Sequence, residues 1–315
     1  MKLSKIPISL FSVIMGIMGV TLASARLEKV FNLPHNISLV WLWTGVVIFA
    51  VVSLLYLLKV FFAFESVKAE FFHPVALSFF ATVSVATILV GQGLRLVSSP
   101  VGEKIFVAGS VLQFLFSLAI ISSWLKQSHF EIQHMNPSWF IPAVGNILVP
   151  ALGDFLPPWI QWFFLSIGGF LWFLLMVILF YRLIFHHPLP DKLIPTLFIL
   201  IAPPSVMAIA LSKMSGQEMA IVFYWIAFFF VLILFTFINW FTKIRFALSW
   251  WAYTFPLAAF TIASVVLSRE FPFLLWVGVG TGIVLNIVVL GLFFFTMLYL
   301  LKGKLFEGHE EKKEA

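Results

Sequence analysis

Residues 249–268 read SWWAYTFPLAAFTIASVVLS, and this stretch decides the fold. It is apolar and has about the 20 residues that an α-helix needs to cross a bilayer. Pro256 interrupts it near the middle, directly after the bulky ring of Phe255. A proline within a span frees a backbone carbonyl, which is tolerated only inside protein or against a wet cavity. The stretch therefore predicts a kinked membrane helix that faces other helices or a pore.

The whole chain has the composition of a membrane protein. Of its 315 residues, 62% are hydrophobic and 10% are charged, whereas about a quarter of a soluble domain is charged. We expect a single ten-helix transmembrane domain over 1–302, followed by a short charged cytoplasmic tail over 303–315. Hydropathy places the ten spans of this all-α membrane fold at 6–24, 38–61, 73–94, 104–125, 139–154, 158–184, 193–212, 217–242, 248–268 and 273–301.

The start of the chain permits two interpretations. Lys2 and Lys5, the apolar run 6–22 and the small residues 23–25 resemble a cleavable signal peptide. The alternative, which we favour, is a first span that is retained in the mature protein.

The positive charges predict the orientation in the membrane. Of the 19 lysines and arginines, thirteen fall on the side of the N-terminus and six on the other side. Because cytoplasmic loops are rich in Lys and Arg, and an even number of spans returns the chain to the same side, we expect both termini in the cytoplasm. No basic cluster is interleaved with aromatic residues, so the net charge of +6 does not indicate a nucleic-acid partner.

The odd-numbered and even-numbered spans differ in composition. The even spans 158–184 and 217–242 are rich in Phe, Trp, Leu and Ile and are suited to face lipid. The odd spans carry small and hydroxyl residues, which let helices approach closely. We expect five helical hairpins, with the odd helices in an inner ring around a central pore and the even helices in an outer ring. The alternative is a solid bundle in which the prolines only accommodate packing. The candidate pore-lining residues are Ser12, Gly16, Thr87, Gly145, Asn146 and Ser205, and the candidate kinks are Pro150, Pro203, Pro204 and Pro256.

A search for chemistry inside the spans gives mostly negative results. The seven histidines lie in loops or at span ends, and the carboxylates avoid the span interiors. The chain has no cysteine and no nucleotide-binding or protease motif. We therefore expect no cofactor, no metal site and no enzymatic activity. Proton-coupled carriers usually need an ionisable group in the membrane, so these residues favour a neutral pore for passive movement.

Several segments resemble the bacterial tellurite-resistance TehA proteins and the plant guard-cell slow anion channels, which form one family. They are Phe11–Gly16, His73–Val75, Thr87–Gly91, Val144–Asn146, Ala202–Ser205 and, most specifically, Ser249–Pro256. Ser12 departs from the family pattern, which has a glycine there. As a bacterial homologue, the chain would form a homotrimer in the inner membrane, with a pore in each protomer for small anions of the chloride and nitrate class. The resemblance implies that a phenylalanine closes the pore and assigns this role to Phe255, not to Phe260.

Two classes of function stay open at this stage. The first is a passive anion channel with Phe255 as its gate. The alternative is a carrier or exporter for dicarboxylates, sulfite or tellurite-type oxyanions, which needs a substrate site and alternating access. A structural or enzymatic membrane subunit is a third interpretation. For Phe255 itself, the alternative to a gate is ordinary packing, since the chain has 39 phenylalanines.

Overall fold

In the computed structural model, residues 3–241, 243–303 and 305 are described, and all regular structure within them is helical. Nearly all of the expected tail 303–315 lies outside these residues. Nine helical segments of this part of the chain are long and apolar enough to cross a membrane, and the shorter apolar segment Pro137–Leu152 makes a tenth. The chain is therefore an integral membrane protein of ten helical spans, as its composition predicts.

The ten spans form two layers. In the four longer odd-numbered spans, 72–83% of the most apolar stretch is buried, against 22–39% in the even-numbered spans. This difference confirms that the even spans form the outer layer. The odd spans, called the inner spans below, are Ile8–Val30, Leu77–Leu94, Pro137–Leu152, Asp191–Met214 and Leu248–Leu267. The even spans, called the outer helices, are α2 (Asn36–Phe62), α5 (Ser99–Lys126), α7 (Pro158–Phe185), α9 (Gln217–Thr236) and α12 (Leu274–Leu301).

Each inner span begins as a 3-10 helix and continues as an α-helix. Runs of 3-10 helix beyond three or four residues are uncommon, so the ten-residue η6 is unusual. The pairs are η2 (Ile8–Leu10) with α1 (Phe11–Val30), η3 (Leu77–Phe80) with α4 (Ala81–Leu94), η5 (Pro137–Trp139) with α6 (Phe140–Leu152), η6 (Asp191–Leu200) with α8 (Ala202–Met214), and η7 (Leu248–Tyr253) with α11 (Thr254–Leu267).

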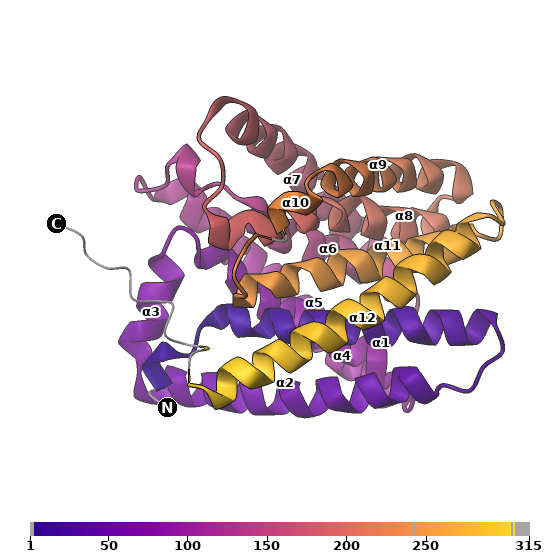
Figure 1. Cartoon of the computed structure of the whole chain (residues 1–315), viewed down its shortest axis with the longest axis horizontal. Helices are drawn as coiled ribbons and strands as arrows, with labels where there is room; N and C mark the ends of the chain where they lie inside the picture. The colour runs from indigo at the N-terminus through magenta and orange to yellow at the C-terminus, as the bar shows by residue number, and fades with distance from the viewer. Residues whose placement is uncertain (1–2, 242, 304, 306–315) are drawn as a thin grey trace.

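The inner spans close into a ring. The most extensive contacts join each inner span to the outer helix that follows it, so the chain folds as five helical hairpins. The inner spans also contact one another in the closed order α1, α4, α6, α8, α11 and back to α1, while each outer helix packs against the inner span of the next hairpin. Because every inner span is followed by a returning outer helix, the inner spans all run in the same direction. The start of the chain and the end of α12, coloured yellow, lie at the same end of the bundle (Figure 1).

The first span is an integral part of this ring. Of its most apolar stretch, 83% is buried, and α1 lies between α4 and α11. Removal of residues 6–25 as a signal peptide would open the inner layer, so the structure supports retention of this span.

Two connections differ from the sequence-based expectation. The joint after α2 folds into a short helix, α3 (Phe64–Phe72), instead of a loop. The expected span 217–242 ends earlier, because α9 stops at Thr236 and a separate turn, α10 (Ile238–Phe241), follows it.

Candidate pore and gate

A small cavity lies inside the ring of inner spans. Its volume is about 20 Å³, which is room for about one water molecule. Its lining is entirely apolar, and a cavity of this kind tends to be dry. All five inner spans contribute to it, and none of its lining residues belongs to an outer helix: Gly19, Leu22, Leu89, Leu148, Ala151, Leu152, Val206, Ile209, Phe255, Ala258, Ala259 and Ile262.

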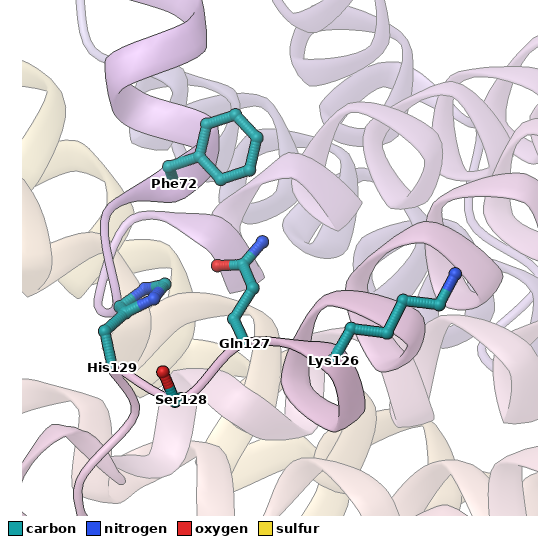
Figure 2. A pocket seen from close by; sticks show the side chains of 5 residues that line it. All are labelled: Phe72, Lys126, Gln127, Ser128 and His129. Atoms are coloured by element: carbon teal, nitrogen blue, oxygen red, sulfur yellow. The ribbon is translucent and has the colours of Figure 1, made fainter.

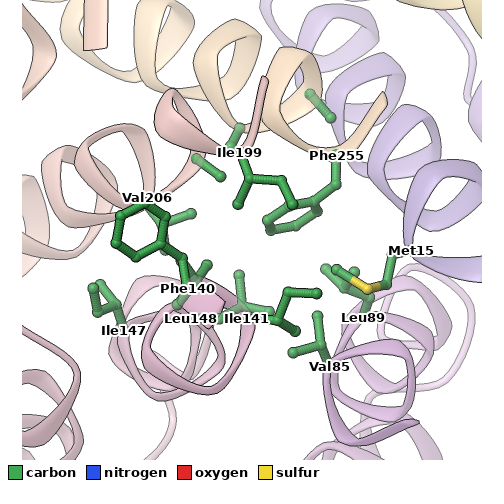
Figure 3. Packing of buried hydrophobic residues seen from close by; sticks show 14 of the residues in the cluster. Met15, Val85, Leu89, Phe140, Ile141, Ile147, Leu148, Ile199, Val206 and Phe255 are labelled. Atoms are coloured by element: carbon green, nitrogen blue, oxygen red, sulfur yellow. The ribbon is translucent and has the colours of Figure 1, made fainter. Parts of the chain in front are cut away.

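Phe255 reaches into this central region from the first turn of α11. Figure 3 shows its ring pointing toward the middle of the ring of helices. Side chains of the four other inner spans surround it: Met15 of α1, Leu89 of α4, Leu148 of α6 and Val206 of α8. The residue is 8% exposed. The ring of Phe255 and the apolar side chains around it therefore leave only the small cavity at the axis of the inner layer.

The contact between α1 and α11 places Phe255 close to the axis. A Cβ atom at Gly19 would lie 3.0 Å from Cβ of Ala258 and 3.7 Å from Cα of Phe255. A Cβ atom at Gly16 would lie 2.2 Å from Oγ1 of Thr254, so this position admits no side chain without movement. Gly16, a candidate for the pore lining, is thus placed in the contact between α1 and α11.

The second phenylalanine of α11 points elsewhere. The ring of Phe260 stacks on the ring of Tyr224 in the outer helix α9, with centroids 5.2 Å apart. Phe260 is fully buried and does not line the cavity. The two rings of one helix therefore face different layers of the molecule.

Gly145 and Asn146 face the outer helix α5. A Cβ atom at Gly145 would lie 2.3 Å from the amide group of Gln113. The Asn146 side-chain amide donates to Oγ of Ser117 at 2.8 Å, and the Gln113 amide donates to the carbonyl oxygen of Pro142 at 2.8 Å. These groups form a buried polar contact between α5 and α6, of the kind that joins helices in lipid. Gln113 lies in an outer helix and was not among the residues predicted from the sequence.

The hydroxyl candidates are satisfied within their own spans. Ser12 donates to the carbonyl oxygen of Ser9 at 2.6 Å, Thr87 to that of Val83 at 2.8 Å, and Ser205 to that of Ile201 at 2.8 Å. None of the three hydroxyl residues lines the cavity.

The prolines mark boundaries within the inner spans. Pro203 and Pro204 lie in the first turn of α8, and Pro256 is the third residue of α11. A proline in the first turn interrupts no hydrogen bond of its helix, so these three residues accompany the change from 3-10 to α-helix. This differs from the expected kink in the middle of a helix. Pro150 does lie inside α6, two residues before its end.

A charged group at the C-terminal ends of the inner spans is the second feature of this region. The Lys213 ammonium donates to the carbonyl oxygen of Ala151 at 2.7 Å. The Arg95 guanidinium donates to the carbonyl oxygen of Leu152 at 3.4 Å and to Oδ1 of Asp154 at 2.8 Å. Burial acts to raise the pKa of Asp154, but the hydrogen bond and charge of Arg95 and the charge of Lys213 outweigh it and lower this pKa. From the sequence alone, Arg95 and Lys104 could concentrate anions near the outer mouth, although loop bases are more often orientation signals.

A partly buried ion pair lies at the opposite end of the bundle, with the Lys59 side chain 1% exposed and the Glu70 side chain 20% exposed. The Lys59 ammonium donates to Oε2 of Glu70 at 2.6 Å and to the carbonyl oxygen of Ile6 at 2.7 Å. The same carboxylate accepts from the Tyr56 hydroxyl at 2.9 Å, and its Oε1 accepts from the backbone N–H of Ile8 at 3.2 Å. Glu70 thus joins α3 to α2 and to the start of the first inner span.

A broad surface hollow of about 500 Å³ lies near this end, where α3 ends and the chain leaves α5. Figure 2 shows its lining side chains, which include Phe72, Lys126 and His129. None of its lining residues belongs to an inner span, so the hollow is separate from the central cavity. Among the residues that the structure describes, no three His, Asp or Glu side chains gather as a metal site requires.

Comparison with known proteins agrees with this architecture. Residues 5–297 match the sequence profile of the SLAC1 family, described as voltage-dependent anion channel. An uncharacterized transporter of Methanocaldococcus jannaschii is 28% identical over 329 aligned positions, which cover 95% of each chain. The S-type anion channel SLAH3 of Arabidopsis thaliana is 31% identical over 279 positions, or 84% of this chain and 43% of the plant protein. The tellurite resistance protein TehA homolog of Haemophilus influenzae is 30% identical over 140 positions, or 44% of this chain and 43% of that protein.

These matches cover nearly the whole chain and confirm the resemblance that the motifs of the inner spans suggested. The chain belongs to the SLAC1 voltage-dependent anion channel family.

Proposed function

We propose that the protein is a passive channel for small inorganic anions of the chloride and nitrate class, closed by Phe255. The observation that carries this proposal is the position of the Phe255 ring among side chains of all the other inner spans (Figure 3). Membership of an anion channel family supports the nature of the permeant ion.

The lining of the cavity supports a hydrophobic gate. The space beside Phe255 has room for about one water molecule and no polar side chain to replace the hydration shell of an ion. A constriction of this kind blocks ions by excluding water. Movement of the Phe255 ring away from the axis would widen it, because the ring is the largest side chain in the lining.

The same lining favours passive conduction over coupled transport. No ionisable residue lines the cavity, whereas proton-coupled carriers usually place such a group in the membrane. A carrier for dicarboxylates, sulfite or tellurite-type oxyanions remains the alternative. It predicts a flux that saturates with substrate and is driven by a pH gradient.

We further propose a homotrimer in the bacterial inner membrane, with both termini in the cytoplasm and a pore in each protomer. The outer helices expose large apolar side chains such as Phe170, Phe173 and Trp276. These side chains suit contact with lipid or with neighbouring copies.

The test of the gate is the current through Phe255→Ala in planar bilayers. If the ring closes the pore, its removal should increase the chloride current by about tenfold or more, which corresponds to about 1.4 kcal/mol of barrier. A folded variant with the current of the unmodified protein would contradict the gate. Anion flux that saturates and needs a pH gradient would contradict the channel and favour the carrier.

A further inference from the structure

The direction of the inner spans creates an electrostatic problem at one mouth of the pore. Because the inner spans run in parallel, the C-terminal ends of α1, α4, α6, α8 and α11 gather at the end of the bundle opposite to the N-terminus. Each helix C-terminus carries the equivalent of roughly half a negative charge. A mouth formed by five such ends repels anions unless positive groups offset it.

Basic side chains occupy the positions where this offset is needed. Leu22 and Ile209 line the cavity, and Arg26 and Lys213 follow them by four residues. Residues four apart share one face of a helix, so each base lies one turn beyond a lining residue. Arg95 follows the last residue of α4 directly. These three bases therefore lie on the inner side of the ring, between the cavity and the solvent.

Two of these bases reach the end of α6, which supplies no basic residue of its own. Lys213 and Arg95 donate to the carbonyl oxygens of Ala151 and Leu152, and both of those residues line the cavity. Lys213 is exposed. The Arg95 side chain is 18% exposed. Both positive charges thus lie at the rim of the pore, and Lys213 is the one more open to water.

Two carboxylates oppose the bases at this rim, and Glu103 is the more distant, with Oε1 3.7 Å from Nε of Arg95. Asp154 is the closer one. Its carboxylate lies 2.8 Å from the guanidinium of Arg95, and its side chain is 59% exposed. Arg26 also acts on Lys213 by its charge. The three bases Lys213, Arg95 and Arg26 against the two carboxylates of Asp154 and Glu103 leave an excess of one positive charge.

We propose that Lys213 and Arg95 form a site at this mouth that attracts a small monovalent inorganic anion before it enters the pore, and that Asp154 weakens the site. The proposal rests on the proposed channel function. It differs from a purely structural role, in which the two bases only neutralise the end of α6.

The test compares chloride currents through Lys213→Gln, Asp154→Asn and the unmodified protein, each also combined with Phe255→Ala. Lys104→Gln is the matched control, because Lys104 is an exposed base on the outer helix α5 at the same end of the bundle. In about 20 mM chloride, Lys213→Gln should lower the current of anions that enter from this side by about twofold. Asp154→Asn should raise it by a similar factor. Both effects should vanish near 1 M salt, where the Debye length falls to about 3 Å.

The control and the direction of flow separate the possible outcomes. If the chloride current of Lys213→Gln stays low at high salt, Lys213 has a structural role and the proposed anion site is refuted. An equal loss in Lys104→Gln, or equal currents in all variants, would overturn it as well. If neither the unmodified protein nor Phe255→Ala passes anions, the channel itself is refuted and the site with it. Currents that respond to Phe255 but not to Lys213 or Asp154 refute the site alone.

Discussion

The ring of Phe260 stacks on the ring of Tyr224, with centroids 5.2 Å apart and planes 13° apart. This pair joins α11 to the outer helix α9, whereas Phe255, five residues earlier, lines the central cavity of the inner ring. The two phenylalanines therefore provide a matched pair for separating gating from packing.

Phe260→Ala should destabilise the protein without opening it. Removal of a fully buried ring costs about 3–5 kcal/mol, and the loss falls between α11 and α9. We expect a lower melting temperature in detergent and no gain in chloride current, the reverse of Phe255→Ala. A current in Phe260→Ala as large as in Phe255→Ala would mean that any loosening of α11 opens the pore.

Gly16→Ala should destabilise the contact between α1 and α11. The new Cβ atom would lie 2.2 Å from Oγ1 of Thr254 and 2.7 Å from the ring of Trp251. Overpacking of this kind costs about 1–3 kcal/mol. Gly280→Ala is the control, because no atom lies within 4 Å of its Cβ position, and alanine favours a helix by about 1 kcal/mol. Equal melting temperatures for the two variants would contradict the close contact.

Lys59→Met should weaken the attachment of α3. The Glu70 side chain is 20% exposed, so loss of Lys59 leaves a partly buried carboxylate without its positive partner and should lower the melting temperature. The double variant with Glu70→Gln should recover much of this loss in thermal melting. Lys68→Met, at an exposed position of α3, should change stability by about 0.5 kcal/mol or less. A double variant no more stable than Lys59→Met would show that the charge of Glu70 is not what destabilises the single variant.

The ion pair between Asp154 and Arg95 should stabilise the protein at pH values above the ordinary aspartate pKa of 3.8. This stabilisation should disappear in acid. The pKa of the Asp154 carboxyl is lower in the folded protein than in the unfolded chain. The stabilisation is therefore complete at pH values above the ordinary pKa and disappears as the pH falls through the lowered pKa. Melting curves of the unmodified protein and Asp154→Asn should differ by a constant amount from pH 7 to about pH 5 and converge in stronger acid. A difference that changes between pH 7 and pH 5 would assign the effect to another group.

The sequence predicts the layers of this fold better than the contacts within them. Small residues such as Gly16 and Gly145 indicate close packing, but not which neighbour approaches, and they face α11 and α5. Gln113 gave no signal, since one polar residue on an apolar outer helix does not reveal its partner. Hydropathy also does not distinguish 3-10 from α-helix, so Pro256 was expected in mid-helix.

The position of Phe255 was predicted from the motif around it, and its role as a gate stays a prediction. Among the bases at the far mouth, the sequence points to Arg95 and Lys104 as residues that could concentrate anions, but it does not point to Lys213. The arrangement of these bases around α6 depends on long side chains that contact a neighbouring helix, such as Lys213, which donates to Ala151. The spacing of residues within one helix does not predict such contacts between helices.

The 3-10 starts of the inner spans make up for the shortness of their α-helices. With 13 residues, α8 spans about 20 Å, too short for a hydrocarbon layer of about 30 Å. The ten residues of η6 add about 20 Å, because a 3-10 helix rises about 2.0 Å per residue against about 1.5 Å for an α-helix. With its 3-10 start, this inner span thus comes close to the length of an outer helix such as α7, whose 28 residues span about 42 Å.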